Sequence, residues 1–212
     1  MNNQLQVYIK KTILIFVIIV MNFCLLNTQK TLAIENTLQE KVSDYCTKGD
    51  KIVNHYETSN DKINSLEYLK AAKYYYYQAI RLDKSNPNGL VGLAHVALLQ
   101  DKTRDAKNIL MAALNFNPEN PRVSFYIGET FFQEGDFTEA IDYYTWAYNH
   151  GYKHNYKTNL QLAICYEKIY ETELAKRHYN EALKIKPDSN DIKKRLSNLQ
   201  KAQEEIYKYS NL

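Results

Sequence analysis

An alanine that recurs every 34 or 35 residues constrains the fold of this chain more than any other feature of its sequence. These alanines are Ala72, Ala106, Ala140 and Ala175. Four positions after each stands a large residue, in turn Tyr76, Leu110, Tyr144 and Tyr179, and seven positions after each stands a second alanine, in turn Ala79, Ala113, Ala147 and Ala182. Spacings of four and seven place side chains on one face of an α-helix. The chain therefore repeats one helix four times, and the alanines let a neighbouring helix approach it closely.

A second helix precedes the repeated one in each of the last three units. A large residue beside a small one marks it, in the pairs Leu93-Ala94, Ile127-Gly128 and Leu162-Ala163. The turn between the two helices is clearest at Gly135-Asp136, because glycine tolerates a positive φ and aspartate caps the helix that follows. Pro118 and Pro187 end units, since proline cannot continue a helix.

This unit resembles the tetratricopeptide repeat, a 34-residue helix–turn–helix with the same small and large positions. The best copy, Pro121 to His154, has Gly128, Phe131, Gly135-Asp136-Phe137, Ala140-Ile141, Tyr144 and Ala147 in the family order, with Tyr152 in place of the closing proline. The resemblance covers about two thirds of the chain. It implies an all-α fold, a right-handed α-solenoid of helix–turn–helix repeats, and it is poorly specific for function.

The repeat divides the chain into segments with different expected roles. We expect N-terminal helices with an irregular first repeat at 34–86, three repeats at 87–120, 121–155 and 156–189, and a C-terminal capping helix at 190–212. In the irregular repeat, Ser59 and Asn60 stand where later units have an apolar and a small residue, so its first helix is expected to start near Leu38 and to end before a longer loop around 59–64. The capping helix places Ile192, Leu196, Leu199 and Ile206 on one face, which would cover the open end of the solenoid.

The first 33 residues have the layout of a secretory signal peptide. Two lysines precede the uncharged run 12–26, and a small-residue cleavage site follows, which predicts cleavage between Ala33 and Ile34. The alternative is an uncleaved membrane anchor at residues 10–28, although the apolar run is shorter than the ~20 residues that span a bilayer comfortably. A lipid anchor on Cys24 is disfavoured, because Asn and Phe precede it where small residues are expected. The expected location is therefore periplasmic, envelope or secreted, with contact to a membrane only if the segment is retained.

Cleavage would also change the charge balance. The segment holds three of the 27 basic residues and none of the 24 acidic ones, so 24 of each sign remain. A net charge of zero gives no support for nucleic-acid binding, which favours a basic face on the folded domain. Cys46 and Cys165 lie 119 residues apart and are expected to be unpaired, with Cys165 on a buried helix face.

The resemblance also implies where a partner would bind, because in this family the first helix of each unit lines a concave surface. The residues expected on that surface are Val91, His95, Leu98, Arg122, Phe125, Glu129, Phe132, Gln133, Leu160, Ile164, Glu167 and Lys168. A mostly apolar surface with a few charges suits a peptide or an amphipathic helix. The alternative is that the first or last helix of the chain itself fills the groove. One subclass holds a C-terminal carboxylate through basic residues, and Val91, His95 and Leu160 at those places predict no such clamp.

Motifs for catalysis, a cofactor or a metal are missing from the sequence. It has no glycine-rich phosphate loop, no nucleophile elbow and no zinc-ligand spacing. The leading hypothesis is a non-catalytic scaffold that binds proteins or peptides in the cell envelope. The second is a membrane-tethered structural subunit of an envelope assembly, and the third is an enzyme of unrecognised type.

Overall fold

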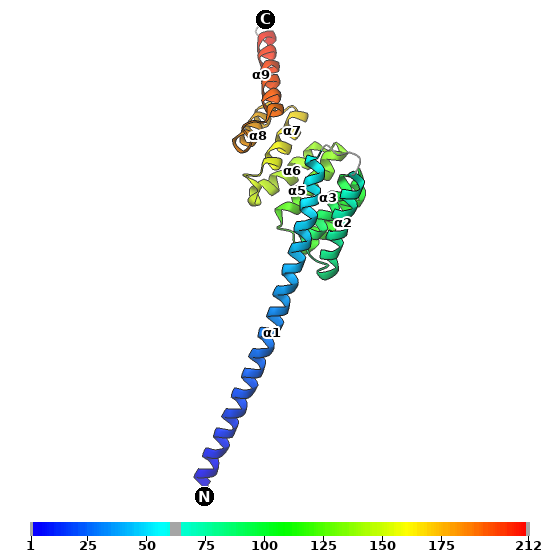
Figure 1. Cartoon of the computed structure of the whole chain (residues 1–212). Coiled ribbons are helices and arrows are strands. Elements are labelled where there is room, and N and C mark those ends of the chain that lie inside the picture. The colour runs from blue at the N-terminus through cyan, green and yellow to red at the C-terminus, as the bar shows by residue number, and fades with distance from the viewer. Residues whose placement is uncertain (1, 60–64, 211–212) are drawn as a thin grey trace. The chain divides into compact units, whose positions relative to one another are not determined.

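The described part of the chain consists of helices joined by short turns (Figure 1). The computed structural model describes the backbone of residues 2–59 and 65–210, and the side chains of 20–59 and 66–208. The helices are α1 (Asn2–Thr58), α2 (Ser65–Leu82), α3 (Pro87–Leu98), α4 (Thr103–Phe116), α5 (Pro121–Glu134), α6 (Phe137–Ala147), the π-helical η1 (Tyr148–Tyr152), α7 (Tyr156–Lys168), α8 (Thr172–Ile185) and α9 (Asn190–Ser210). Two compact units divide the chain at Tyr45, and each is described by itself.

The first unit consists of the N-terminal part of α1. This helix begins at Asn2 rather than near Leu38 as expected, because neither glycine nor proline occurs before Gly49. The side chains of residues 20–37 are exposed, and the predicted cleavage bond after Ala33 lies within the helix. In the described residues no helix has a stretch both long and apolar enough to cross a membrane. The signal peptide remains a prediction, and the expected loop at 60–64 lies outside the described residues.

The second unit stacks the helix pairs α3–α4, α5–α6 and α7–α8 beside α2, and the alanine columns form its core. Val53, near the end of α1, packs with Leu69 and Tyr76 of α2. Each alanine of both columns is fully buried, and so are the four large residues between them: Tyr76, Leu110, Tyr144 and Tyr179. Consecutive helices from α2 to α9 pack against one another. The fold is therefore the all-α solenoid that the repeat predicts.

Two further sets of residues recur at the repeat spacing. One set caps the first helix of each unit, and the other lies at the turn between its two helices. Asn86, Asn120 and Asn155 are the N-caps of α3, α5 and α7, and each side-chain oxygen accepts a hydrogen bond from a backbone N–H of the first turn. At the turn inside each of the same units one residue has a positive φ: Asp101 (57°), Gly135 (85°) and Tyr170 (65°). These caps and turns keep the two helices of each unit in register.

The C-terminal helix covers the last repeat with only its first turns. Ile192 is buried beside Ala175 and Ala182, and Leu196 and Leu199 pack at its margin. Ile206 was expected on the same face but is 69% exposed. The reason is geometric, because α9 continues past the end of α8, and residues 200–208 are all exposed.

Candidate functional site

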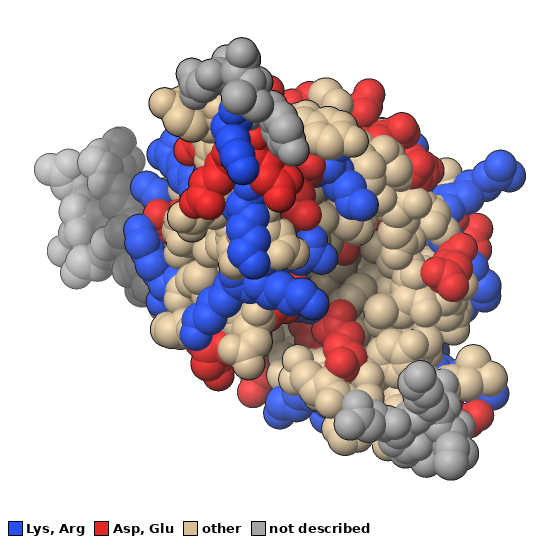
Figure 2. All heavy atoms as spheres, turned by 90° about the horizontal axis from the view of Figure 1, so that it is seen from above, with Lys and Arg blue, Asp and Glu red and all other residues tan. Residues whose placement is uncertain are grey.

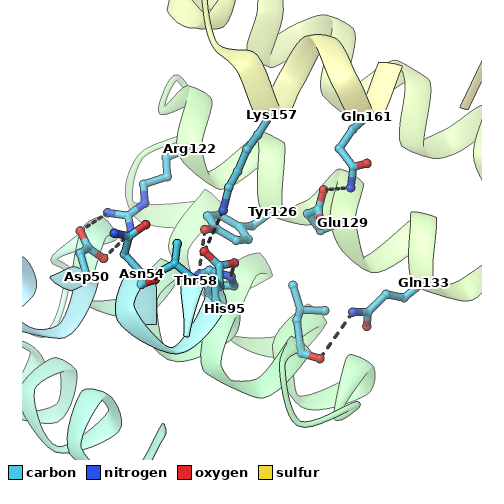
Figure 3. A network of polar contacts seen from close by, with 12 residues as sticks. Asp50, Asn54, Thr58, His95, Arg122, Tyr126, Glu129, Gln133, Lys157 and Gln161 are labelled. Carbon is cyan, nitrogen blue, oxygen red and sulfur yellow. Dashed lines mark hydrogen bonds and ion pairs between the residues drawn. The ribbon is translucent and has the colours of Figure 1, made fainter. Parts of the chain in front are cut away.

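A pocket of about 230 Å³ lies among the first helices of the repeats. We call it the central pocket, and it is lined by Glu57, His95, Phe125, Tyr126, Glu129, Lys157, Leu160 and Gln161. These residues come from the C-terminal end of α1 and from α3, α5 and α7. Segments up to 100 residues apart in the sequence thus meet at one cavity (Figure 3).

Glu57 joins three helices at the edge of this pocket. Its Oε1 accepts a hydrogen bond from Nε2 of His95 at 3.1 Å, and its Oε2 pairs with Nζ of Lys157 at 2.9 Å. Burial alone would raise the pKa of Glu57, but the hydrogen bonds from His95 and Lys157 outweigh it and lower the pKa to about 2. Glu57 is therefore ionised at neutral pH, with both carboxylate oxygens occupied.

The orientation of His95 follows from its two neighbours. An ionised carboxylate only accepts hydrogen bonds, so Nε2 of His95 donates to Glu57. Nδ1 of the same ring lies 2.9 Å from the Tyr126 hydroxyl, within hydrogen-bond distance. The Tyr126 ring also packs on the imidazole, with centroids 4.7 Å apart. Tyr126 and Glu57 thus hold the His95 ring from its two nitrogens against the pocket wall.

Glu129 is the second carboxylate of the central pocket. Its Oε1 accepts hydrogen bonds from the Tyr144 hydroxyl and from Nε2 of Gln161, both at 2.6 Å. Burial raises the pKa of Glu129, and these hydrogen bonds only partly oppose the shift. Among the described residues no hydrogen bond reaches Oε2 of this pocket-lining carboxylate.

A separate polar cluster lies beside the pocket (Figure 3). Arg122 on α5 pairs with Asp50 on α1, with Nη2 to Oδ1 at 2.6 Å and Nη1 to Oδ2 at 3.2 Å. The Tyr76 hydroxyl donates to Oδ1 of the same carboxylate at 2.7 Å. Burial alone would lower the pKa of Arg122, but Asp50 raises it. This bidentate pair ties α1 to α5 and leaves no open oxygen on Asp50.

The twelve residues expected to bind a partner fall into three groups. Those that line the central pocket are His95, Phe125, Glu129 and Leu160. Those in or against the core are Val91, Leu98, Phe132 and Ile164. Those held by other side chains or by backbone are Arg122, Gln133, Glu167 and Lys168. Arg122 pairs with Asp50, and Gln133 hydrogen-bonds to Thr103 and to the Leu98 carbonyl. Glu167 hydrogen-bonds to Tyr179 and pairs with Arg195, and Nζ of Lys168 lies 6.0 Å from the Phe137 ring centroid. Partner binding by these twelve residues stays a prediction.

Four pocket residues were not anticipated: Glu57, Tyr126, Lys157 and Gln161. Glu57 lies in the irregular first repeat, where the columns give no alignment. Lys157 and Gln161 are four residues apart on α7, so they flank the predicted Leu160 on one helix face. Their helical spacing from Leu160 could have placed both residues beside it from the sequence alone. For Glu57 the sequence offers no such signal, because its partners lie 38 and 100 residues away.

The end of α1 also bears on whether a terminal helix fills the groove. Asp50 and Glu57 contact α3, α5 and α7, so the last turns of α1 form one wall of the pocket. The pocket nevertheless stays open.

On the face seen in Figure 2, basic and acidic side chains are interspersed.

Comparison of the sequence with protein-family models agrees with the repeat spacing of the alanines. The tetratricopeptide-repeat family matches residues 69–124, and a second model of that repeat matches 156–189. The chain contains tetratricopeptide repeats. Among curated proteins none matches the chain significantly.

Solved structures with the same repeat superpose on the chain. Pseudomonas aeruginosa PilF aligns with a TM-score of 0.66 at 16% identity, over 80% of this chain and 72% of PilF. YrrB, described as a TPR protein with an unusual peptide-binding site, aligns at 0.53 and 16%, over 79% of this chain and 84% of YrrB. The first TPR domain of Spaghetti (RPAP3), bound to an HSP90 peptide, aligns at 0.51 and 17%, over 55% of this chain and 94% of that domain. At these identities the likeness concerns the fold alone.

Proposed function

We propose that this protein is a non-catalytic interaction module that binds a peptide or helix of a partner protein at the central pocket. The observation that carries the proposal is that four helices from four repeats bring apolar and polar side chains to one open cavity. Tetratricopeptide repeats are generally interaction modules, and the superposed structures include a TPR domain with a bound peptide and a TPR protein with a peptide-binding site.

The size of the pocket favours a partner side chain over a free small molecule. Its volume of about 230 Å³ lies below the roughly 300–1,000 Å³ of typical small-molecule sites. Phe125 and Leu160 give it an apolar wall, while His95 and Glu129 supply polar groups. We infer that one side chain of a bound peptide enters the pocket and that the rest of the peptide lies along the neighbouring first helices.

Site-specific photocrosslinking tests this assignment. A benzoylphenylalanine at Gln161, inside the pocket, is expected to capture partner proteins in cells that make this chain. The matched control carries the same group at Glu139, an exposed position on α6 outside the pocket. Capture at position 139 with none at 161 would overturn the proposed binding face.

We also propose that the protein is exported, on the sequence pattern of residues 1–33. N-terminal sequencing of the protein from cells tests this proposal. A species that begins at Ile34 is expected. A species that retains residues 10–28 and sediments with membranes would instead support the membrane-tethered subunit.

A further inference from the structure

The charges of the central pocket do not balance within the pocket. Two carboxylates, Glu57 and Glu129, face it together with one ammonium group, that of Lys157. Lys157 lies 2.9 Å from Glu57, and His95 occupies the other Glu57 oxygen. Glu57 therefore forms a direct ion pair within the chain, whereas no described side chain forms one with Glu129.

Neutral donors hold only one side of Glu129. The Tyr144 hydroxyl and the Gln161 amide both donate to Oε1, and among the described groups none donates to Oε2. An ionised carboxylate in a partly buried site is costly unless an opposite charge meets it. Lys157 and His95 act on Glu129 only through space and do not cancel the effect of burial on its pKa. No described side chain forms an ion pair with Glu129, so a cation at Oε2 would stabilise its ionised form.

The other pocket walls suit the stem of a long basic side chain. Phe125 and Leu160 are apolar, and Phe125 packs edge-on against Tyr126 with ring centroids 5.2 Å apart. Aromatic faces attract guanidinium and ammonium groups, and aliphatic stems of lysine and arginine pack on apolar surface. A volume of about 230 Å³ accommodates one such side chain.

We propose that the central pocket binds a basic side chain, arginine or lysine, of the partner peptide, and that this side chain pairs with Oε2 of Glu129. The inference rests on the proposed function and specifies the chemistry of its partner. An acidic side chain would face Glu129 and Glu57 with only Lys157 to attract it, and Lys157 is already paired. A neutral side chain would leave Glu129 without a counter-charge.

Model peptides test the preference directly. The probes are acetyl-Ala-Leu-X-Leu-Ala-amide with X as arginine, lysine, citrulline, norleucine or glutamate. Citrulline has the shape of arginine without its charge. Binding is followed by NMR through the side-chain amide of Gln161, which reports from within the pocket. The arginine and lysine peptides are expected to bind at least fivefold more tightly than the citrulline peptide, and 0.5 M NaCl is expected to reduce that ratio.

Variants of Glu129 assign the preference to one carboxylate. Glu129→Gln should bring the arginine-to-citrulline ratio close to one, and Glu129→Asp, which keeps the charge, should retain part of it. Glu134→Gln removes a carboxylate from the same helix outside the pocket and should leave the ratio unchanged. If Glu129→Gln does not fold, two other measurements test the role of this carboxylate. The arginine-to-citrulline ratio of the unmodified protein should fall in 0.5 M NaCl, and Glu129→Asp should retain part of it.

Two results would overturn the inference. One is equal binding of the arginine and citrulline peptides by the unmodified protein, or no response of Gln161 to any peptide. The other is an arginine preference that survives in Glu129→Gln. Neither result decides the proposed function, because crosslinking at position 161 tests the binding face whatever side chain enters the pocket.

Discussion

The hydroxyl of Tyr144 donates a 2.6 Å hydrogen bond to Oε1 of Glu129 and so links the two helices of one repeat. The same column provides the same link twice more, from Tyr76 to Asp50 at 2.7 Å and from Tyr179 to Glu167 at 2.5 Å. In each case a tyrosine ring fills the core while its hydroxyl holds a carboxylate on the first helix. At the central pocket the repeat core thus positions Glu129.

Removal of the Tyr144 hydroxyl should destabilise the protein. Tyr144→Phe leaves Glu129 with Gln161 as its remaining donor, and a hydrogen bond contributes about 0.5–3 kcal/mol, the higher values applying to charged groups. We expect a loss of about 1–2 kcal/mol in urea unfolding. Tyr143→Phe is the control, because that ring stacks on Phe131 with centroids 5.5 Å apart and lies partly outside the core. Equal stability of the two variants would contradict the prediction.

The raised pKa of Glu129 predicts a stability contribution with a definite sign. A folded-state pKa above the unfolded value means that the folded protein binds the proton more tightly. This contribution is fully present below the unfolded pKa of about 4.5 and is lost as the pH rises through the folded value. Glu129→Gln is therefore expected to gain stability relative to the unmodified protein as the pH rises above 4.5, in urea titrations over a range of pH. A constant difference across that range would contradict it.

Glu57 should show the opposite dependence. Its pKa is lowered from 4.5 to about 2, so its contribution is present above pH 4.5 and is lost as the pH falls towards 2. The side chain is 26% exposed, so solvent screening reduces the contribution to about 1 kcal/mol. Glu57→Gln is expected to flatten the loss of stability between pH 5 and 3. The control is Glu119→Gln, an exposed carboxylate before α5, which should leave the slope unchanged.

The repeat columns predict the core because packing between adjacent helices is local in the sequence. Ala72, Ala106, Ala140 and Ala175 could be aligned by spacing alone, and all are fully buried. The pocket was only partly predictable. Val91 and Leu98 were placed on the groove by helical spacing, yet residues 91–98 of α3 are buried on every side, by the helices around them.

The contacts of α1 explain what else was missed. Glu57 meets Lys157 across 100 residues, and no periodicity connects those positions. The first repeat also departs from the family pattern around Ser59, so the register for the end of α1 could not be derived from the repeat columns. Such a contact follows only from how the solenoid curves, which depends on small rotations accumulated over the repeats.

Two glycines should be intolerant of alanine although both lie in helices. An added Cβ at Gly92 would lie 2.1 Å from Cε1 of Tyr76, and one at Gly128 would lie 2.7 Å from Cε1 of Tyr144. Helix propensity favours alanine over glycine by about 1 kcal/mol, but overpacking in a rigid core costs about 1–3 kcal/mol. We expect both variants to melt at a lower temperature, with Gly92→Ala the less stable. Gly89→Ala is the control, since its Cβ meets the movable Ile80 side chain at 3.0 Å.

Tyr170 stands in the turn position that glycine occupies in the preceding repeat. Its φ is 65°, and its side chain is 90% exposed, so the left-handed conformation is not offset by burial of the ring. The left-handed conformation costs a non-glycine residue about 1–2 kcal/mol of stability. Glycine avoids that cost but lowers stability by about 0.5–1 kcal/mol, because it raises the conformational entropy of the unfolded chain. Tyr170→Gly is therefore expected to raise the free energy of unfolding by about 0.5–1 kcal/mol. Asp101→Gly, at the equivalent turn, should change it little, because aspartate tolerates this conformation. A loss of stability in Tyr170→Gly would show that the exposed ring stabilises the turn through contacts that outweigh its backbone strain.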